Sequence, residues 1–279
     1  MSIMDYKKQN LKSYILALML LPFLIIMIYP FLFMISSTFK TAAGVINEGF
    51  SLIPKVFTTQ AYSIVFSGTS FERYFMNSAI VTVIVVAGNV LFAPMAGYAF
   101  AKKEFRGKNA MFICLLASTM VPIHITLIPL YKLFMEISWI DTYKVMIIPF
   151  LALPMGVFLM RQYIQGLPSA IEQSARIDGC SEMGIYWRII FPLTKPALAV
   201  LIITTFLTIW NSYIWPFIFV QDKNLWTLTV GIANYASYKK SAFNETMVTA
   251  TIATLPTAIV FLIFQNQIIS GLTSGAIKE

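Results

Sequence analysis

The sequence of 279 residues contains little charge, one histidine and two cysteines. Asp, Glu, Lys and Arg make up 11% of the chain, whereas soluble domains contain roughly 25%. A single histidine cannot complete an H-E-x-x-H metal site. The P-loop pattern G-x-x-x-x-G-K-[ST], which would hold the phosphates of ATP, is also missing. These absences exclude an ordinary soluble domain, a P-loop ATPase and a zinc hydrolase of that type.

Long apolar runs take the place of charge, and hydrophobic residues make up 58% of the chain. A run of about 18 or more uncharged residues is long enough to cross a bilayer as a helix. The run Val145–Met160 is shorter than this, and it can span the membrane only if the Lys144 side chain at its start extends toward the interface. We predict an all-α integral membrane protein with six transmembrane helices. The predicted spans are Ser13–Phe39, Tyr74–Ala101, Asn109–Tyr131, Val145–Met160, Pro196–Gln221 and Thr246–Ile277.

The basic residues predict the orientation of these spans. The cluster Lys102–Lys108 lies between the second and third spans, and the positive-inside rule places it in the cytoplasm. Both termini are then cytoplasmic. The net charge of +8 reflects this topology, and six spans leave no contiguous basic face for nucleic acid. Cys114 in a span and Cys180 in a cytoplasmic loop would lie in different compartments and would not pair.

The predicted spans contain no Asp, Glu, Lys or Arg, and His124 is their only histidine. An ion-coupled carrier usually keeps a carboxylate or a broken helix near the middle of the membrane. This composition opposes an ion-coupled secondary transporter and indicates that another polypeptide supplies the energy. His124 either contacts a solute or bonds a backbone carbonyl that Pro122 or Pro129 leaves free.

A polar stretch between the fourth and fifth spans carries helix-capping signals. Ser169 and Glu172 have the form of a capping box, with Ser169 as the N-cap. Gly179 supplies the left-handed residue that ends many helices. Ser181 can cap a second short helix, which Pro192 would terminate or kink. We predict a helix, a turn and a helix at the membrane surface, as a docking element.

The same stretch resembles the EAA loop of binding-protein-dependent ABC importers, whose signature is E-A-A, three residues, Gly, nine residues and I-x-L-P. Gly179, Ile189 and Pro192 match, whereas Gln173, Ser174 and Phe191 stand where the family has Glu, Ala and Leu. The resemblance implies that residues 166–192 form a coupling loop that fits a cleft on a cytosolic ATPase; the alternative is an ordinary capped interfacial helix. The implied coupling residues are Glu172, Gln173, Ser174, Ala175, Asp178 and Gly179, with Glu172 supplying the carboxylate.

Further stretches resemble the carbohydrate branch of that family, including Gly97–Ala101, Ile128–Tyr131 and Trp210–Pro216. They imply a type I importer permease like the smaller, six-helix subunit of maltose-type importers. The implied divisions are an N-terminal helix and external loop (1–70), a permease core (71–270) and a cytoplasmic tail (271–279).

The resemblance also implies an assembly in a bacterial cell membrane. A second permease would form a heterodimer with this chain, and two ATPase subunits would bind ATP and Mg, while this chain binds no cofactor. A solute-binding protein outside the membrane would deliver an oligosaccharide. Import of glycerol 3-phosphate by the same class of transporter is the nearer alternative.

Two aromatic groups are candidates for ligand contact. In the fifth span Trp210, Asn211, Tyr213 and Trp215 combine apolar faces with hydrogen-bonding edges, as a sugar requires. At about 100° per residue, Trp210 and Tyr213 would share one helix face. The alternative is an aromatic belt at the interface. The resemblance implies that the external segment 222–244 contacts the solute-binding protein, through Trp226, Tyr235 and Tyr238. The alternative is an ordinary surface loop.

Because the chain lacks a P-loop, the purified polypeptide is expected to hydrolyse no ATP and to drive no uptake by itself. Uptake into liposomes that contain only this chain, measured under imposed proton and sodium gradients, checks this expectation. Accumulation of solute under either gradient would contradict it and would favour a secondary transporter.

Overall fold

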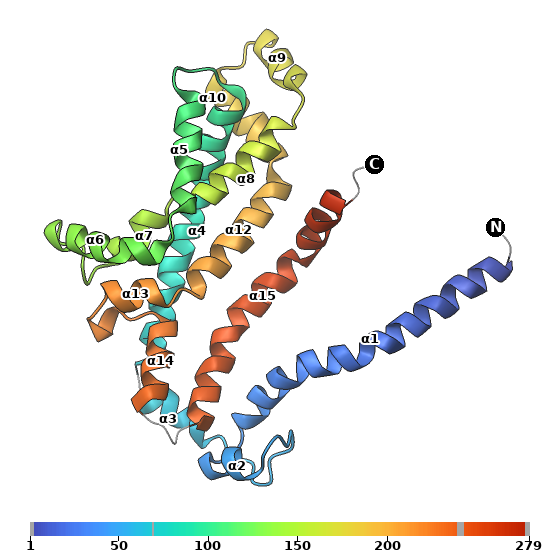
Figure 1. Cartoon of the computed structure of the whole chain (residues 1–279), viewed down its shortest axis with the longest axis vertical. Helices are drawn as coiled ribbons and strands as arrows, with labels where there is room; N and C mark the ends of the chain where they lie inside the picture. Colours follow the sequence, from blue (N-terminus) through green and yellow to red (C-terminus); the bar gives the residue numbers. More distant parts are fainter. Residues whose placement is uncertain (1–2, 69, 239–242, 277–279) are drawn as a thin grey trace. The chain divides into compact units, whose positions relative to one another are not determined.

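The computed structural model describes residues 3–68, 70–238 and 243–276, and in this part of the chain all regular structure is helical (Figure 1). The helices are α1 Ile3–Ser37, α2 Ala42–Asn47, α3 Gln60–Gly68, α4 Phe71–Lys102, α5 Lys108–Met120, α6 Ile123–Glu136, α7 Tyr143–Ile147, α8 Pro154–Gln165, α9 Ser169–Ile177, α10 Glu182–Ile185, α11 Phe191–Leu193, α12 Lys195–Trp210, α13 Ile214–Phe219, α14 Leu228–Tyr238 and α15 Phe243–Ala276. Two 3-10 turns, η1 Ile148–Phe150 and η3 Lys223–Leu225, and the π-helical turn η2 Tyr186–Ile190 complete the set. The predicted all-α class is confirmed.

The chain forms two compact units. The first contains Met1–Phe71 and Ile232–Thr254, and the second contains Glu72–Gly231 and Leu255–Glu279. Segment 232–254 therefore packs with the N-terminal residues, a grouping that a division at residue 70 does not include. The segment predicted as an external loop contains two short helices, α2 and α3.

Four helical segments are long and apolar enough to cross a membrane as continuous or nearly straight spans. They are Leu18–Ser37, Phe71–Lys102, Tyr143–Gln165 and Phe243–Gln265. Two further spans are found only if a pair of helices that meet at a bend is counted as one span. These pairs are α5 with α6, which meet at a bend of 102°, and Glu182–Leu193 with α12, which meet at a bend of 74°. A multi-pass membrane protein is confirmed, and the number of six spans stays a prediction.

The third, fourth and fifth predicted spans are wrong as continuous α-helices, the fourth because η1 and residues 151–153 separate α7 from α8. The third breaks at Val121 and Pro122, because proline lacks an N–H and restricts the residue before it to extended backbone. Beyond this break α6 runs across the direction of α5 (Figure 1). In the fifth, α12 ends at Trp210, and α13 begins only at Ile214.

Glycines permit close packing in the second unit. A Cβ on Gly97 of α4 would lie 2.8 Å from the Met160 side chain of α8, and one on Gly156 would lie 2.7 Å from Leu201 of α12. Helix α8 therefore approaches both α4 and α12 closely, as membrane helices with small residues at their contacts do. Around them Met160 and Leu201 join the buried core of this unit.

Asn89, which is fully buried in α4, holds the break between η1 and α8. Its amide nitrogen donates to the Phe150 carbonyl at 2.6 Å, and its amide oxygen accepts from the Leu153 N–H at 2.8 Å. These bonds satisfy backbone groups that the broken helix leaves free, as a membrane interior requires.

The orientation can be checked by cysteine labelling in a chain whose two native cysteines have been replaced. Cysteines at Asn109 and Ser181 are expected to react only from the cytoplasmic side, and one at Lys223 only from outside, since all three positions are exposed. Gly231 is unsuitable as an external probe, because a Cβ there would lie 2.2 Å from the Tyr74 ring. External labelling of Ser181 would contradict the predicted topology.

Candidate functional site

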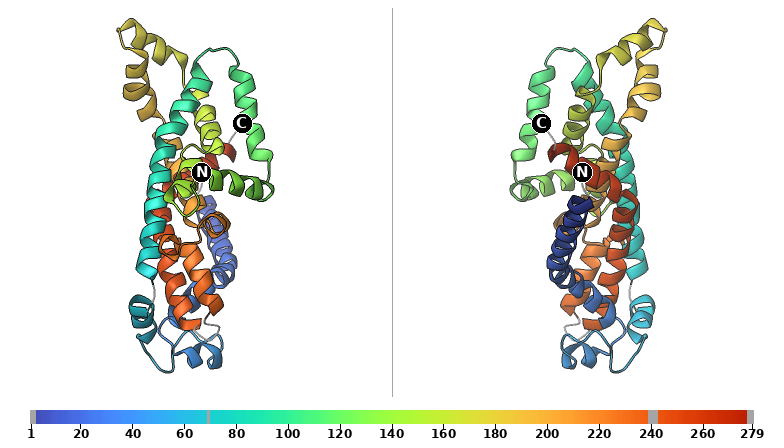
Figure 2. Two further views of the ribbon diagram at one scale, coloured as in Figure 1. Left: turned by 90° about the vertical axis from the view of Figure 1, so that its left-hand side faces the viewer. Right: turned by 90° about the vertical axis from the view of Figure 1, so that its right-hand side faces the viewer.

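The loop between α8 and α12 folds as a short helix, a turn and a second short helix. Figure 2 shows α9 and α10 extending past the ends of the neighbouring helices of their unit. The predicted N-cap is wrong: Ser169 is the first residue of α9, and the preceding Pro168 provides no side-chain cap. Glu172 does not close a capping box, because its carboxylate bonds side chains outside the turn.

The predicted end of α9 is confirmed in detail. Gly179 adopts a left-handed backbone with φ of 80°. The Cys180 N–H donates to the Ala175 carbonyl at 2.9 Å, and the Gly179 N–H donates to the Arg176 carbonyl at 3.1 Å. These two bonds form a Schellman motif, in which the left-handed residue allows the last carbonyls to be satisfied.

The second helix begins as predicted, with the Ser181 hydroxyl accepting from the Gly184 N–H at 3.2 Å. The predicted kink near Pro192 is confirmed, but the helical path continues through Pro192 and bends by 74° at Thr194. Proline is tolerated there because it lies in the first turn of α11, where its missing N–H has no helical partner. The π-helical turn η2 precedes this bend.

One face of α9 is buried and the other is exposed. Glu172 and Ala175, spaced three residues apart, are 3% and 5% exposed. From residue 173 onward the exposed positions are Gln173, Ser174, Arg176, Ile177, Asp178 and Gly179. Of the residues that the resemblance singles out, the structure thus turns two toward the chain's own core and four toward the surface.

The buried Glu172 carboxylate attaches α9 to the C-terminal end of α4. Its Oε2 accepts from the Tyr98 hydroxyl at 3.0 Å and lies 3.5 Å from Nη2 of Arg176. Its Oε1 lies 3.9 Å from Nζ of Lys102, which also donates to the Leu167 carbonyl. A buried carboxylate is stable only with such partners.

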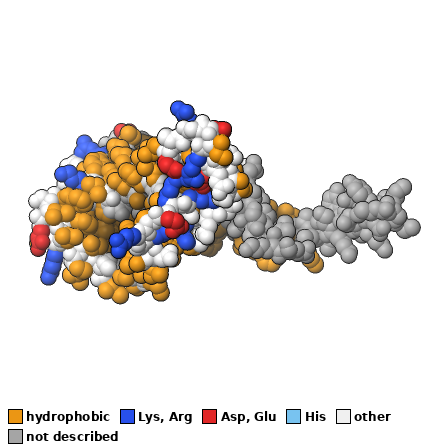
Figure 3. Space-filling model, turned by 90° about the horizontal axis from the view of Figure 1, so that it is seen from above, with side chains coloured by type: hydrophobic (Ala, Val, Ile, Leu, Met, Phe, Trp, Pro, Cys, Tyr) orange, Lys and Arg blue, Asp and Glu red, His pale blue; other side chains and the backbone are white. Residues whose placement is uncertain are grey.

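A second carboxylate, Glu182 of α10, joins the same cluster. Arg176 approaches it with Nε at 2.7 Å and Nη2 at 3.4 Å, and Lys103 of α4 forms an ion pair with it. The hydrogen bonds from Arg176 first, and from Lys103 second, lower the pKa of Glu182 to about 2. The carboxylate therefore stays ionised at physiological pH. Figure 3 shows the mixed acidic and basic side chains seen from this end.

Sequence reasoning missed the α4 side of this cluster and two exposed apolar residues. Tyr98, Lys102 and Lys103 lie about 70 residues before the loop, so no local pattern links them to Glu172. Ile177 is 86% exposed and Met183 59%. Apolar side chains in an otherwise polar loop were a visible signal, since such residues commonly anchor protein interfaces.

The predicted solute residues do not share a helix face, because the helix breaks between them. Trp210 and Trp215 are buried, and the Trp215 indole nitrogen donates to the Val145 carbonyl at 2.9 Å. Asn211 and Tyr213 are exposed, with the Tyr213 ring stacked on Phe217. The prediction that Trp210 and Tyr213 share one helix face is wrong, and their contact with solute stays a prediction.

The predicted contact segment for a binding protein is largely helical. Trp226 is half-buried, packs 6.0 Å from the Tyr74 ring and precedes α14. Tyr235 lies within α14 and is half-buried, whereas the side chain of Tyr238 lies outside the described residues. Contact of segment 222–244 with a solute-binding protein stays a prediction.

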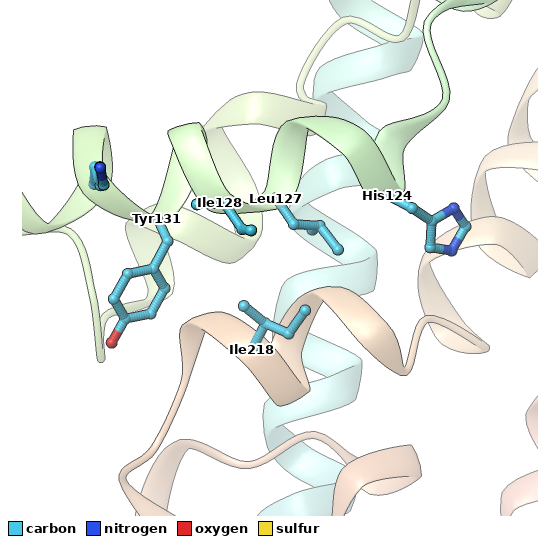
Figure 4. Close-up of a pocket in the computed structure, with 6 residues that line it drawn as sticks. His124, Leu127, Ile128, Tyr131 and Ile218 are labelled. Carbon is cyan, nitrogen blue, oxygen red and sulfur yellow. The ribbon is translucent and has the colours of Figure 1, made fainter.

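His124 lines an open cavity of about 370 Å³ between α6 and α13. In Figure 4 Leu127 and Ile128 face Ile218 across this cavity, with His124 and Tyr131 at its two ends. The cavity is mainly apolar, and both roles predicted for His124 stay predictions. Within the described residues, no group of three His, Cys, Asp or Glu side chains could hold a metal ion.

Replacing Glu172 by alanine should loosen α9, because the Tyr98 hydroxyl loses its buried acceptor and the Lys102 ammonium loses an ion pair. Leaving such a group unsatisfied costs about 1–3 kcal/mol. The matched control is Gln173→Ala, at the neighbouring exposed position. Hydrogen exchange of the α9 amides should accelerate in the first variant and stay unchanged in the second. Equal exchange in both would show that the carboxylate does not hold the helix.

Comparisons with known proteins agree with this geometry. Residues 90–274 match the family model described as the inner membrane component of binding-protein-dependent transport systems. The chain is 35% identical over 254 residues to the arabinooligosaccharides transport system permease protein AraQ of Bacillus subtilis, covering 90% of each chain. It is 30% identical over 278 residues to the trehalose/maltose transport system permease protein MalG of Thermococcus litoralis, covering 98% of this chain and 99% of that one.

Among solved structures, a chain of a bacterial ABC transporter involved in importing the acidic polysaccharide alginate has the same fold. The TM-score is 0.79 at 21% identity, and the match covers 95% of this chain and 98% of that chain. The family match extends over most of the chain and includes the whole helix-turn-helix loop. The chain belongs to the family of binding-protein-dependent transport system inner membrane components.

Proposed function

We propose that this chain is a permease subunit of an ABC importer for an oligosaccharide, driven by separate ATPase subunits that dock on the loop between α8 and α12. The observation that carries the proposal is the loop itself. It has one face fixed to α4 through Glu172 and an opposite face that leaves Gln173, Ile177 and Asp178 exposed. An exposed, rigid, partly apolar surface of this kind suits docking of a partner protein.

The complete assembly would contain a second permease, two cytosolic ATPases and an external solute-binding protein. ATP and Mg would bind to the ATPases, and this chain would hydrolyse none. Both termini would lie in the cytoplasm of a bacterial cell. Carbohydrate is favoured over glycerol 3-phosphate as the solute, because the relatives AraQ and MalG are named for arabinooligosaccharide and trehalose/maltose transport.

Force would pass from the docked ATPase into the permease along two routes. The first runs from α9 through the Glu172 contacts to Tyr98 and Lys102 at the end of α4. The second follows the chain from α10 through η2 to the bend at Thr194 and into α12. Closure of the two ATPases would then move α4 and α12 as packed bodies and change the side on which the central path is open.

Gly179→Val tests whether the loop transmits this force. A β-branched residue in a left-handed conformation is destabilised by about 1–2 kcal/mol. No atom lies within 4 Å of the added Cβ, so backbone strain is the main effect. The variant should insert and pair with its partner permease, while it retains less ATPase on the purified complex and transports less sugar.

Gly49→Val is the matched control, because Gly49 is also left-handed, with φ of 55°, and also has open space around it. It lies in the loop predicted to be external, so its complex should retain the ATPase. Full ATPase retention and normal uptake in Gly179→Val would reduce the loop to a surface helix. The solute itself is best identified from the ligand bound by the cognate external binding protein.

A further inference from the structure

The loop between α2 and α3 exposes a set of large apolar side chains. Phe50 and Ile53 are each 79% exposed, Phe57 is 68% and Val56 is 60%. Single exposed apolar residues are normal, but a group of this kind within eight residues marks an interaction surface. This surface has no part in the docking loop.

The loop folds back along the end of α1 (Figure 1). The Tyr29 hydroxyl donates to the Phe50 carbonyl, the Ser36 hydroxyl donates to the Leu52 carbonyl, and the Phe33 ring lies 5.7 Å from the Phe50 ring. Tyr29 precedes the last residue of α1 by two helical turns, or about 12 Å along the axis. The loop between α2 and α3 therefore lies beside α1 as far back as Tyr29, two turns before the C-terminal end of that helix.

The depth of the loop coincides with the apolar part of α1. The candidate span Leu18–Ser37 lies within the uncharged run Ser13–Phe39, and its 18-residue apolar window has no buried residue within this chain. This run is long enough to cross the hydrocarbon core, so its end before Lys40 lies near one boundary of the membrane. Phe50, bonded at Tyr29, is then placed at the level of lipid, where a water-soluble partner cannot reach.

Side chains satisfy part of the backbone of the loop. Three consecutive carbonyls, those of Phe50, Ser51 and Leu52, each accept a hydrogen bond from a side chain. The donor to Ser51 is Nζ of Lys40, at 2.6 Å. Lys40 is fully buried and also lies 3.3 Å from Oε2 of Glu48. Each such bond removes an unsatisfied backbone group, which would be costly close to hydrocarbon.

The charges of the loop also fit a lipid surface. Between Gly49 and Thr58 the only charged residue is Lys55, which is exposed. A lysine on an apolar loop can place its stem among acyl chains and its ammonium among phosphates. The one carboxylate nearby, Glu48, is neutralised by Lys40.

We propose that residues 49–57 form an apolar loop that inserts its side chains into the lipid leaflet next to the outer end of α1. The choice of the outer leaflet rests on the orientation given under the proposed function, whereas the insertion itself does not. The loop would fix the depth and tilt of α1, whose 18-residue apolar window has no buried residue within this chain.

The test uses the assembled transporter in liposomes of phosphatidylethanolamine and phosphatidylglycerol, with Cys114 and Cys180 replaced by serine. A nitroxide label is attached to Ile53→Cys and, as the matched control, to Thr59→Cys. Thr59 is exposed and follows Thr58, whose N–H bonds the Phe39 carbonyl beyond the end of α1. The label at residue 53 should be several-fold more accessible to oxygen than to a water-soluble nickel chelate, with the opposite preference at residue 59.

Two results would overturn the proposal. Equal access of the nickel chelate to both labels would place the loop in water, and protection of residue 53 from both reagents would place it against protein, such as the partner permease. An impermeant thiol reagent on Thr59→Cys reports the side of the membrane separately. Labelling from the cytoplasmic side would contradict the proposed orientation and leave lipid insertion standing.

Discussion

The buried carboxylate of Glu172 is the group on which the arrangement of the loop between α8 and α12 depends. A carboxylate that is 3% exposed must be compensated, and here the compensation comes from Tyr98 and Lys102 of α4 and from Arg176 of α9. Because Tyr98 and Lys102 lie on α4, α9 cannot shift relative to α4 without breaking the hydrogen bond to Tyr98 and the ion pair with Lys102. The exposed residues of α9 are therefore held in place relative to α4. A surface that binds a partner protein requires such a fixed position.

The same requirement, that polar groups near a membrane keep partners, explains the broken helices. Asn89 supplies both a donor and an acceptor at the break before α8, and the Trp215 indole bonds the Val145 carbonyl in α7. In the loop after α2, Lys40 and two hydroxyl groups bond three successive carbonyls. Irregular backbone thus occurs where side chains from other segments satisfy it.

Features set by neighbouring residues could be predicted from the sequence. The left-handed Gly179 and the Ser181 cap depend on a few adjacent positions, and both are present. The family resemblance of the loop rests on such local spacing as well. In contrast, the contact between Glu172 and Tyr98 joins residues that are 74 positions apart, and hydrophobicity carries no information about it. The capping-box interpretation was wrong for this reason, since a tertiary partner took the carboxylate.

Hydrophobicity also could not locate the breaks within apolar runs. Val121 and Pro122 end α5 inside a run that is free of charge, and the sequence Trp210–Pro216 reads as one span although its helix stops for three residues. Uncharged composition reports that a segment can enter lipid, and says nothing of whether its path is straight. Because of this break, the four residues predicted to contact solute have different environments. Trp215 is buried and its indole nitrogen bonds the Val145 carbonyl, whereas Asn211 and Tyr213 are exposed. Asn211 and Tyr213 are thus the exposed members of the four predicted solute residues, and the Asn211 amide nitrogen donates to the Leu207 carbonyl at 2.9 Å.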